Sequence, residues 1–205
     1  MRRICLINGS LRGKKASSLE FLRDVESRLP DAEYAKTIVT VKARLNGSYP
    51  SEVLGQLAAA DALILVFPLY AYAIPGALMR LLEDYCSYTR SGKQYTREAK
   101  VYAIVNCGFP RPVIFGECVR VLMNFCRRLS LDWRFAVCIS SGPVVVTTKR
   151  VPFLDLKLKR AFAAIASDLK SGGSAPRVDY FIRPAIPAPI CLMVKRRYEK
   201  KMDMR

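Results

Sequence analysis

The sequence predicts a doubly wound α/β domain, in which a parallel sheet carries helices on both faces. Three observations predict it: short apolar runs alternate with segments of helical spacing, the central runs are apolar at every position, and each run ends at a polar or proline-containing loop. Strands that are apolar on both faces need cover from both sides, as in a parallel sheet between helices. With 205 residues, 51% of them hydrophobic, the chain is long enough for one such domain.

The first part of the chain predicts three strands, each followed by a helix. Apolar or β-branched runs indicate strands at residues 3–7, 34–41 and 62–67. Apolar residues spaced three and four apart then predict helices over residues 18–29, 51–60 and 75–85. Ser51 suits a helix start, and Pro75 suits a first helical turn because its missing N–H is not needed there.

The second part predicts two more strands and two more helices, with an appendage. Strands are expected at residues 100–105 and 135–139, and helices at 119–126 and 158–169. The five strands should connect by right-handed crossovers. We expect the domain to span residues 1–176. Residues 177–205 then form a C-terminal extension that carries prolines and a basic tail at 195–201.

Composition excludes several classes of chemistry. The chain has no histidine, which excludes Ser-His and Cys-His nucleophile pairs and imidazole acid–base catalysis. Its seven cysteines contain no Cys-x-x-Cys pair, and an odd number argues against a secreted disulfide framework. We therefore expect no metal site and no iron–sulfur cluster. Chemistry should come from a cofactor or from carboxylate, Lys, Tyr or Cys groups.

Targeting signals are not expected either. The longest mainly apolar run, residues 58–74, is interrupted by Asp61 and Pro68, so it falls short of the roughly 20 residues of a membrane helix. The start, Met-Arg-Arg, precedes an apolar run too short for a signal peptide. We expect a cytoplasmic protein.

The net charge of +17 calls for an anionic partner, which can be nucleic acid, a membrane surface or a phosphorylated ligand. The excess is spread along the chain and is densest in residues 176–205. We expect the extension to be an arm that crosses to a partner subunit. Contact of its basic end with nucleic acid or a membrane stays open as an alternative.

The loop after the first strand has the groups of a phosphate site. Ligands of doubly wound folds bind beyond the carboxyl ends of the strands, where this loop lies. It contains Ser10, Arg12, Ser17 and Ser18, whose hydroxyls and guanidinium could cradle one phosphate together with helix amides. Neither a dinucleotide nor a triphosphate fingerprint is present, so a monophosphate fits best. The alternative is an ordinary strand-to-helix turn with Ser caps.

The loops after the third and fourth strands carry aromatic residues that should converge. Tyr70, Tyr72 and Phe109 could stack on a planar ring, which contributes about 0.5–1.5 kcal/mol beyond area burial. Alternatively, they pack against a second subunit or the core. Cys107 lies here too, but with no histidine to lower its pKa we expect a core-like role.

Charge near these loops favours an electron-rich ligand. Residues 68–75 and 106–112 contain no carboxylate, and Arg111 is present. A positive surrounding stabilises a ring that carries negative charge.

Three motifs together resemble the flavodoxin-like NAD(P)H-dependent FMN reductase and oxidoreductase family. They are Gly9-Ser10-x-Arg12 with serines at the next helix start, Phe67-Pro68-Leu69-Tyr70, and Ile74-Pro75-Gly76-Ala77-Leu78. The resemblance covers about residues 3–170 and implies a five-stranded sheet of order 2-1-3-4-5. Leu11 stands where many relatives have Pro, and Ser17 where Asn is common, but the phosphate donors remain.

The resemblance implies FMN as cofactor and NADPH or NADH as co-substrate, with no catalytic side chain because the flavin carries the chemistry. It assigns the FMN phosphate to Ser10, Arg12, Ser17 and Ser18. It assigns the ring to two loops: Pro68, Leu69, Tyr70 and Ala71, and Asn106, Cys107, Gly108 and Phe109.

Electrons would then pass to a small acceptor, which is a quinone, a nitro or azo compound, a metal ion or oxygen. A homodimer is implied as well, because flavin sites of the family commonly lie at dimer interfaces. Two alternatives stay open: a flavodoxin-type one-electron carrier, and an anion-binding relative of the fold without flavin.

Overall fold

The computed structural model describes residues 1–12, 16–43, 47–92, 95–109, 112–148 and 155–183, together with Met193 and Arg196. Its centre is a parallel sheet of six strands in the order β2-β1-β3-β4-β5-β6. The strands are β1 (Arg2–Asn8), β2 (Tyr34–Thr40), β3 (Ala62–Pro68), β4 (Lys100–Asn106), β5 (Asp132–Ile139) and β6 (Tyr180–Ile182). The expected order of the first five strands is confirmed.

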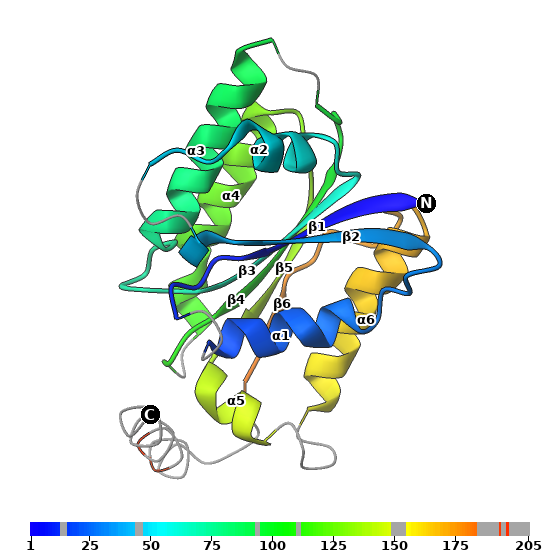
Figure 1. Cartoon of the computed structure of the whole chain (residues 1–205). Coiled ribbons are helices and arrows are strands. Elements are labelled where there is room, and N and C mark those ends of the chain that lie inside the picture. Colours follow the sequence, from blue (N-terminus) through cyan, green and yellow to red (C-terminus); the bar gives the residue numbers. More distant parts are fainter. Residues whose placement is uncertain are drawn as a thin grey trace.

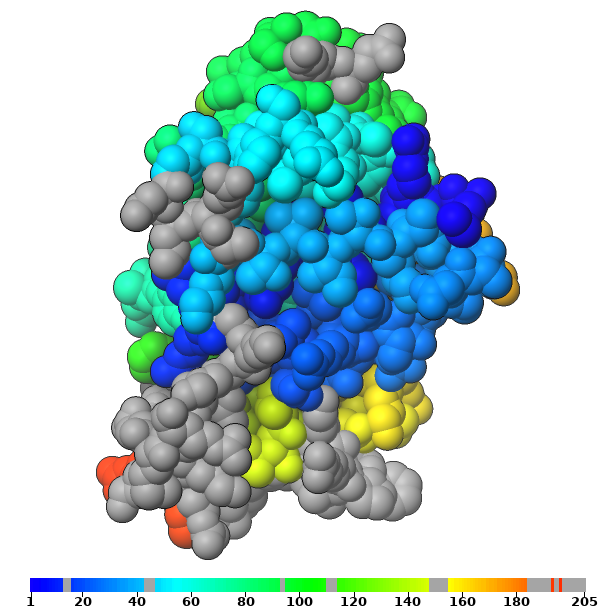
Figure 2. Space-filling model, in the orientation of Figure 1, coloured from blue at the N-terminus to red at the C-terminus, as the bar shows by residue number. Residues whose placement is uncertain are grey.

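Helices cover both faces of this sheet, as the sequence predicts. They are α1 (Ser17–Glu26), α2 (Ser51–Ala58), α3 (Gly76–Arg90), α4 (Gly116–Arg128), α5 (Gly142–Thr148) and α6 (Leu156–Lys170), with short 3₁₀ turns at Val41–Ala43 and Pro112–Phe115. Figure 1 shows α2, α3 and α4 on one side of the sheet and α1, α5 and α6 on the other. In the same orientation, Figure 2 shows the β2 edge, where the blue N-terminal segments cover the middle of the face.

The sheet has one strand more than the sequence predicts, so the expected count of five was too low. β6 pairs in parallel with β5 and lies in the segment assigned to the C-terminal extension. Its three residues are too few to show an alternating pattern. α5 was missed as well, because its run of Val and Thr is β-branched and has low helix propensity.

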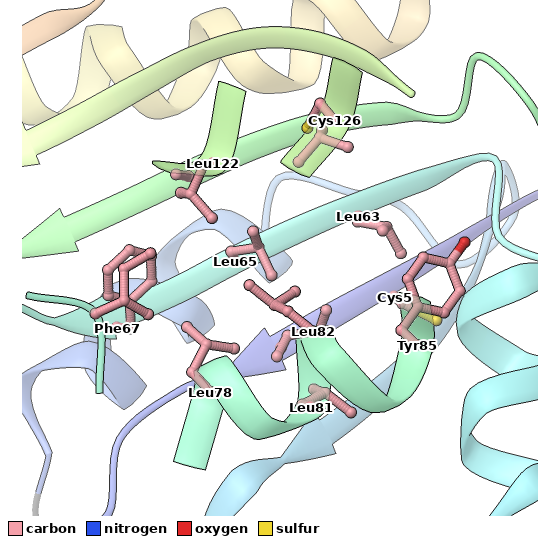
Figure 3. Close-up of a cluster of buried hydrophobic side chains, with 14 of the residues drawn as sticks. Cys5, Leu63, Leu65, Phe67, Leu78, Leu81, Leu82, Tyr85, Leu122 and Cys126 are labelled. Atoms are coloured by element: carbon pink, nitrogen blue, oxygen red, sulfur yellow. The ribbon is translucent and has the colours of Figure 1, made fainter. Parts of the chain in front are cut away.

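Alternate residues of each strand enter two separate cores. One core lies under α2, α3 and α4, where Leu78, Leu81, Leu82 and Tyr85 are all at most 3% exposed, as their helical spacing predicts. Figure 3 shows three of these leucines of α3 against Leu63, Leu65 and Phe67 of β3. The cysteines expected in the core are buried there: Cys5, Cys118, Cys126 and Cys138.

The second core lies under α1, α5 and α6. Phe21 of α1 packs edge-on against Phe162 of α6, with ring centroids 6.3 Å apart. Each fully buried Phe, Leu or Ile side chain contributes about 1.5–3 kcal/mol relative to exposure. The two cores fix the sheet between the helices, and the loops that follow the strands lie at its carboxyl end.

A buried ion pair braces the opposite, amino end of the sheet. Arg134 of β5 donates to both carboxylate oxygens of Asp168 in α6, at 2.9 and 3.2 Å, and Tyr102 donates to the same carboxylate at 2.8 Å. Asp168 is fully buried. Burial by itself would raise the pKa of Asp168, but the bonds from Arg134, the Ala175 amide and Tyr102 outweigh it and lower that pKa below 3.8.

Among the residues that the structure describes, no helix is long and apolar enough to cross a membrane. Within the same ranges, no group of three or more His, Cys, Asp or Glu side chains is placed to hold a metal ion.

Replacing Asp168 with Asn leaves the buried Arg134 without its main counter-charge. We expect Asp168→Asn to lower the free energy of unfolding by about 2–4 kcal/mol at neutral pH, measured by urea denaturation. A carboxyl with a lowered folded pKa contributes stability that is complete above its ordinary value of 3.8 and is lost as pH falls below it. The gap between wild type and variant should therefore shrink in acid.

Asp31→Asn is the matched control, because the Asp31 carboxylate is 89% exposed and pairs with Lys36 at the surface. Because this carboxylate is open to solvent, the pair should contribute less than about 1 kcal/mol. Equal losses in the two variants would contradict the proposed brace.

Candidate functional site

The neighbouring strands β1 and β3 are followed by helices on opposite faces of the sheet. The loop after β1 leads to α1 on one face, while the loop after β3 leads to α3 on the other (Figure 1). Neighbouring strands whose connections diverge leave a crevice at that edge, which is where doubly wound domains bind ligands.

Polar side chains are buried at this edge in unusual number. Of the ten buried polar or charged side chains among the described residues, six lie at the carboxyl ends of β1, β4 and β5 or at the start of α1: Asn8, Ser10, Ser18, Asn106, Ser140 and Ser141. The strand residues that directly precede them are apolar and buried: residues 4–7 in β1, 103–105 in β4 and 135–139 in β5. Because buried polar groups cost free energy unless they are bonded, their concentration here marks the edge as a site.

The loop after β1 is held close to β3. The Gly9 amide donates to the Val66 carbonyl at 2.8 Å. A Cβ on Gly9 would lie 2.7 Å from the Phe67 Cβ and 2.8 Å from the Leu78 Cδ2, so only glycine fits. Next in the chain, the Ser10 hydroxyl accepts the Arg12 amide at 3.2 Å, which turns the loop toward α1.

The four residues predicted to hold a phosphate have different environments. Arg12 is exposed, Ser17 is half-buried, and Ser10 and Ser18 are buried. Ala16 takes the N-cap position of α1 and makes no side-chain cap bond, so the positive end of this ten-residue helix is not neutralised by its own cap. Gly13, Lys14 and Lys15 of the same loop lie outside the described residues.

Ser18 has a structural bond that the sequence did not indicate. Its hydroxyl donates to the side-chain oxygen of Asn106 at 2.8 Å, and both groups are buried. The Asn106 carbonyl in turn accepts the Leu69 amide at 2.7 Å. Asn106 therefore joins the loops after β1, β3 and β4, three segments that the sequence assigns to one site.

The loop after β3 forms a tight turn with exposed aromatic residues. Tyr70 and Ala73 exchange two backbone hydrogen bonds, at 3.1 and 2.8 Å. Between them, Ala71 and Tyr72 have positive φ angles of 46° and 66°. Leu69 is buried and anchors the turn, whereas Tyr70 is 43% and Tyr72 is 60% exposed.

The loop after β4 runs beside it and has a buried half and an exposed half. Asn106 and Cys107 are buried, Gly108 is half-buried, and Phe109 is 60% exposed. Burial raises the pKa of Cys107, with a smaller opposing effect from backbone hydrogen bonds, so the thiol stays protonated. It donates to the Phe109 carbonyl at 3.2 Å, in line with the expected core-like role.

The loop after β5 also belongs to this edge, although no site residue is predicted in it. The Ser141 amide donates to the Phe109 carbonyl at 3.0 Å, and the Gly142 amide donates to the Cys107 carbonyl at 2.7 Å. These two hydrogen bonds hold the loop after β4 in its conformation. The buried Ser140 hydroxyl has no hydrogen-bond partner among the described residues. The sequence does contain a signal for this loop: Ser-Ser-Gly follows directly after an apolar strand, and similar Ser, Gly or Pro residues end the strands before the other loops.

Arg111, the positive residue expected near the ring loops, lies outside the described residues, as does the basic tail apart from Arg196.

A cavity of about 870 Å³ lies at the amino end of the strands, between the end of α4 and the segment after α6. None of the predicted site residues lines it, and its Asp132 is already paired with Arg134 and Arg177. We therefore assign the site to the carboxyl edge.

Comparison with protein families identifies one match. The family described as NADPH-dependent FMN reductase matches residues 2–111, more than half of the chain, and its range includes the loops after β1, β3 and β4. Among curated proteins, none matches the sequence significantly.

Solved structures share the fold at low sequence identity. An NADH:FMN oxidoreductase in its apo form superposes with a TM-score of 0.62 at 13% identity, over 93% of this chain and 98% of that one. An FMN-dependent NADH-azoreductase of Bacillus anthracis, in complex with FMN, gives 0.56 at 16% identity, over 82% and 99%. A WrbA-like flavodoxin protein of Agrobacterium tumefaciens gives 0.58 at 15%, over 83% and 99%.

The close approach at Gly9 gives a direct test of the loop geometry. We expect Gly9→Ala to lower the free energy of unfolding by about 1–3 kcal/mol, because the added methyl group collides with Phe67 and Leu78. Urea denaturation measures the change. Gly116→Ala is the matched control, since nothing lies within 4 Å of its Cβ position at the start of α4. Equal effects in both variants would contradict the packing argument.

Proposed function

Because this chain belongs to the NADPH-dependent FMN reductase family, and is accordingly a flavin-dependent NAD(P)H oxidoreductase, we propose that its FMN site is the carboxyl edge just described. The observation that carries the proposal is the junction at Asn106, which joins the loop of the predicted phosphate residues to both loops of the predicted ring residues. Bound FMN supplies the chemistry there, taking a hydride from NAD(P)H and giving electrons to a small acceptor.

The residues at the start of α1 fit a phosphate group. The exposed Arg12 guanidinium can form paired, charge-assisted hydrogen bonds with phosphate oxygens. The amino end of α1, where Ala16 makes no side-chain cap bond, adds a partial positive charge. Ser17 lies in this first turn, and Ser10 shapes the loop through the Arg12 amide. Ser18 orients the site through its bond to Asn106.

The residues of the two ring loops fit a planar group. Pro68 ends β3 and Asn106 ends β4, and these two residues pair in the sheet. The other ring residues follow directly: Leu69, Tyr70 and Ala71 after β3, and Cys107, Gly108 and Phe109 after β4. Aromatic and backbone surfaces exclude water and orient a ring, and none of these residues carries a negative charge that would oppose an electron-rich one. The protein provides position and environment for the bound flavin.

The identity of the acceptor stays a proposal: a quinone, a nitro or azo compound, a metal ion or oxygen. The choice between NADPH and NADH, the homodimer, the cytoplasmic location and a domain boundary at residue 176 likewise stay predictions. The one-electron carrier and the relative without flavin are separated from the reductase by the experiment below.

The decisive experiment mixes the protein with FMN, removes free flavin on a desalting column under anaerobic conditions, and records the visible spectrum before and after NADPH or NADH. We expect the protein to retain the yellow flavin and to be bleached in one step. Retained colour that neither nicotinamide bleaches would favour the one-electron carrier. A colourless protein would refute the assignment of the site.

Arg12 gives the sharpest single-residue test. We expect Arg12→Ala to raise the dissociation constant for FMN about 10- to 100-fold, since hydrogen bonds to a charged group contribute about 1.5–3 kcal/mol. Affinity for riboflavin, which lacks the phosphate, should not change. Titration monitored by flavin fluorescence measures both.

Arg23→Ala is the matched control, because Arg23 lies on α1 with its side chain 61% exposed and pairs with Glu20. It should leave both affinities unchanged. Equal weakening of FMN and riboflavin by Arg12→Ala would show that Arg12 does not contact the phosphate.

A further inference from the structure

The cavity at the amino end of the sheet is large enough for an organic ligand. Its volume of about 870 Å³ lies between the end of α4, the starts of β4 and β5, and the segment after α6. In Figure 1 the N label marks this end of the sheet, because β1 begins there and all strands are parallel. Pockets for small molecules occupy about 300–1,000 Å³. The proposed FMN site lies at the opposite end and makes no use of this cavity.

The wall of the cavity includes the only tryptophan of the chain. Trp133 is half-buried: it packs against the core under α2, α3 and α4, and it also lines the cavity. The buried Leu131 and Cys126 line the cavity too, together with Met123. An indole beside aliphatic and sulfur-containing side chains forms a polarisable apolar surface, which favours an aromatic ring.

Lys100 brings a positive charge to the same cavity. A Cβ on Gly173 would lie 2.5 Å from the Lys100 Cε, so the missing side chain of Gly173 leaves room for the lysine stem. Lys100 is half-buried, and its ammonium makes no hydrogen bond or ion pair with the part of the chain that the structure describes. A half-buried ammonium without a counter-charge favours an anionic ligand.

The carboxylates of the cavity do not supply that counter-charge. Asp132 pairs with Arg134 and Arg177, at 3.3 and 2.7 Å. Asp179 accepts a backbone amide of β5 at 2.7 Å, and Glu98 is exposed to solvent. The Arg177 side chain is 63% exposed and bonds to Asp132 through one terminal nitrogen, which leaves further N–H donors for a ligand.

Two strained backbone positions border the cavity. Glu98 and Ser130 are not glycines, yet their φ angles are 62° and 51°. The Glu98 amide donates to the Ser130 carbonyl at 2.8 Å, which joins the segment before β4 to the turn after α4. Left-handed residues with a side chain cost free energy and cluster at ligand sites. Their position at the cavity therefore supports a binding role.

We propose that this cavity binds a small aromatic acid, with its ring beside Trp133 and its acidic group at Lys100 and Arg177. A neutral aromatic molecule would leave Lys100 without a counter-charge, whereas an inorganic anion would leave the apolar wall in contact with water. The inference goes beyond the proposed function and does not depend on it, because the two sites lie at opposite ends of the sheet.

The test titrates the full-length protein with 2-naphthoate by calorimetry, with and without FMN. We expect one site with a dissociation constant below about 1 mM, unchanged by FMN. The uncharged analogue 2-naphthamide should bind about tenfold more weakly, because it offers no charge to Lys100. Since the chain has one tryptophan, the NMR spectrum of the nitrogen-15-labelled protein has one indole N–H signal. That signal should shift with the same dissociation constant.

Three variants separate the charge from the ring. Lys100→Met removes the charge, so it should weaken 2-naphthoate about tenfold and leave 2-naphthamide unchanged. Trp133→Leu removes the indole, so it should weaken both ligands about three- to tenfold. Lys157→Met is the matched control, because Lys157 is exposed on α6 and does not line the cavity. It should leave both affinities unchanged, and thermal unfolding confirms that each variant is folded.

Four outcomes would overturn the inference. A wild-type protein that gives neither heat nor an indole shift would have no such site. Equal affinities for 2-naphthoate and 2-naphthamide, or an unchanged affinity in Lys100→Met, would show that Lys100 does not bind the acidic group. Competition by FMN would place the acid at the carboxyl edge. A protein that retains no FMN would refute only the proposed function, because the titration without FMN still tests this cavity.

Discussion

The hydrogen bond between Ser18 and Asn106 is the interaction on which the proposed site depends. It is 2.8 Å long and fully buried, and it connects the first turn of α1 with the end of β4. A buried amide oxygen without a partner would cost about 1–3 kcal/mol, so the bond fixes the two segments relative to one another. The Asn106 carbonyl then positions the loop after β3 through Leu69. These two bonds therefore connect the segment proposed to hold the phosphate with both loops proposed to hold the ring.

The two ends of the sheet bury different kinds of polar side chain. At the amino end, the Arg134–Asp168 pair closes the structure with a fully bonded buried charge. At the carboxyl end, neutral Ser and Asn side chains are buried beside the loops of the proposed site, and one hydroxyl, that of Ser140, stays without a partner among the described residues. An enzyme whose cofactor carries the chemistry must hold that cofactor in a fixed position. A well-packed sheet with polar side chains at its carboxyl end suits this role.

Composition excludes histidine chemistry, and burial keeps the Cys107 thiol protonated, but neither observation identifies a cofactor. The flavin follows from membership of the NADPH-dependent FMN reductase family. At the site, Ala71 and Tyr72 both have positive φ angles, and the Tyr72 side chain is exposed.

The sequence by itself determined the doubly wound architecture, five of the strands and the three loops of the site, because apolar runs, helical spacing and Gly or Pro punctuation are local signals. It could not reveal β6, whose three residues form a strand only because β5 offers an unpaired edge. Nor could it reveal that Ser18 bonds to Asn106, 88 residues away, or that Gly9 must be glycine to clear Leu78 of α3. Those features depend on contacts between segments far apart in the chain, which only tertiary packing brings together.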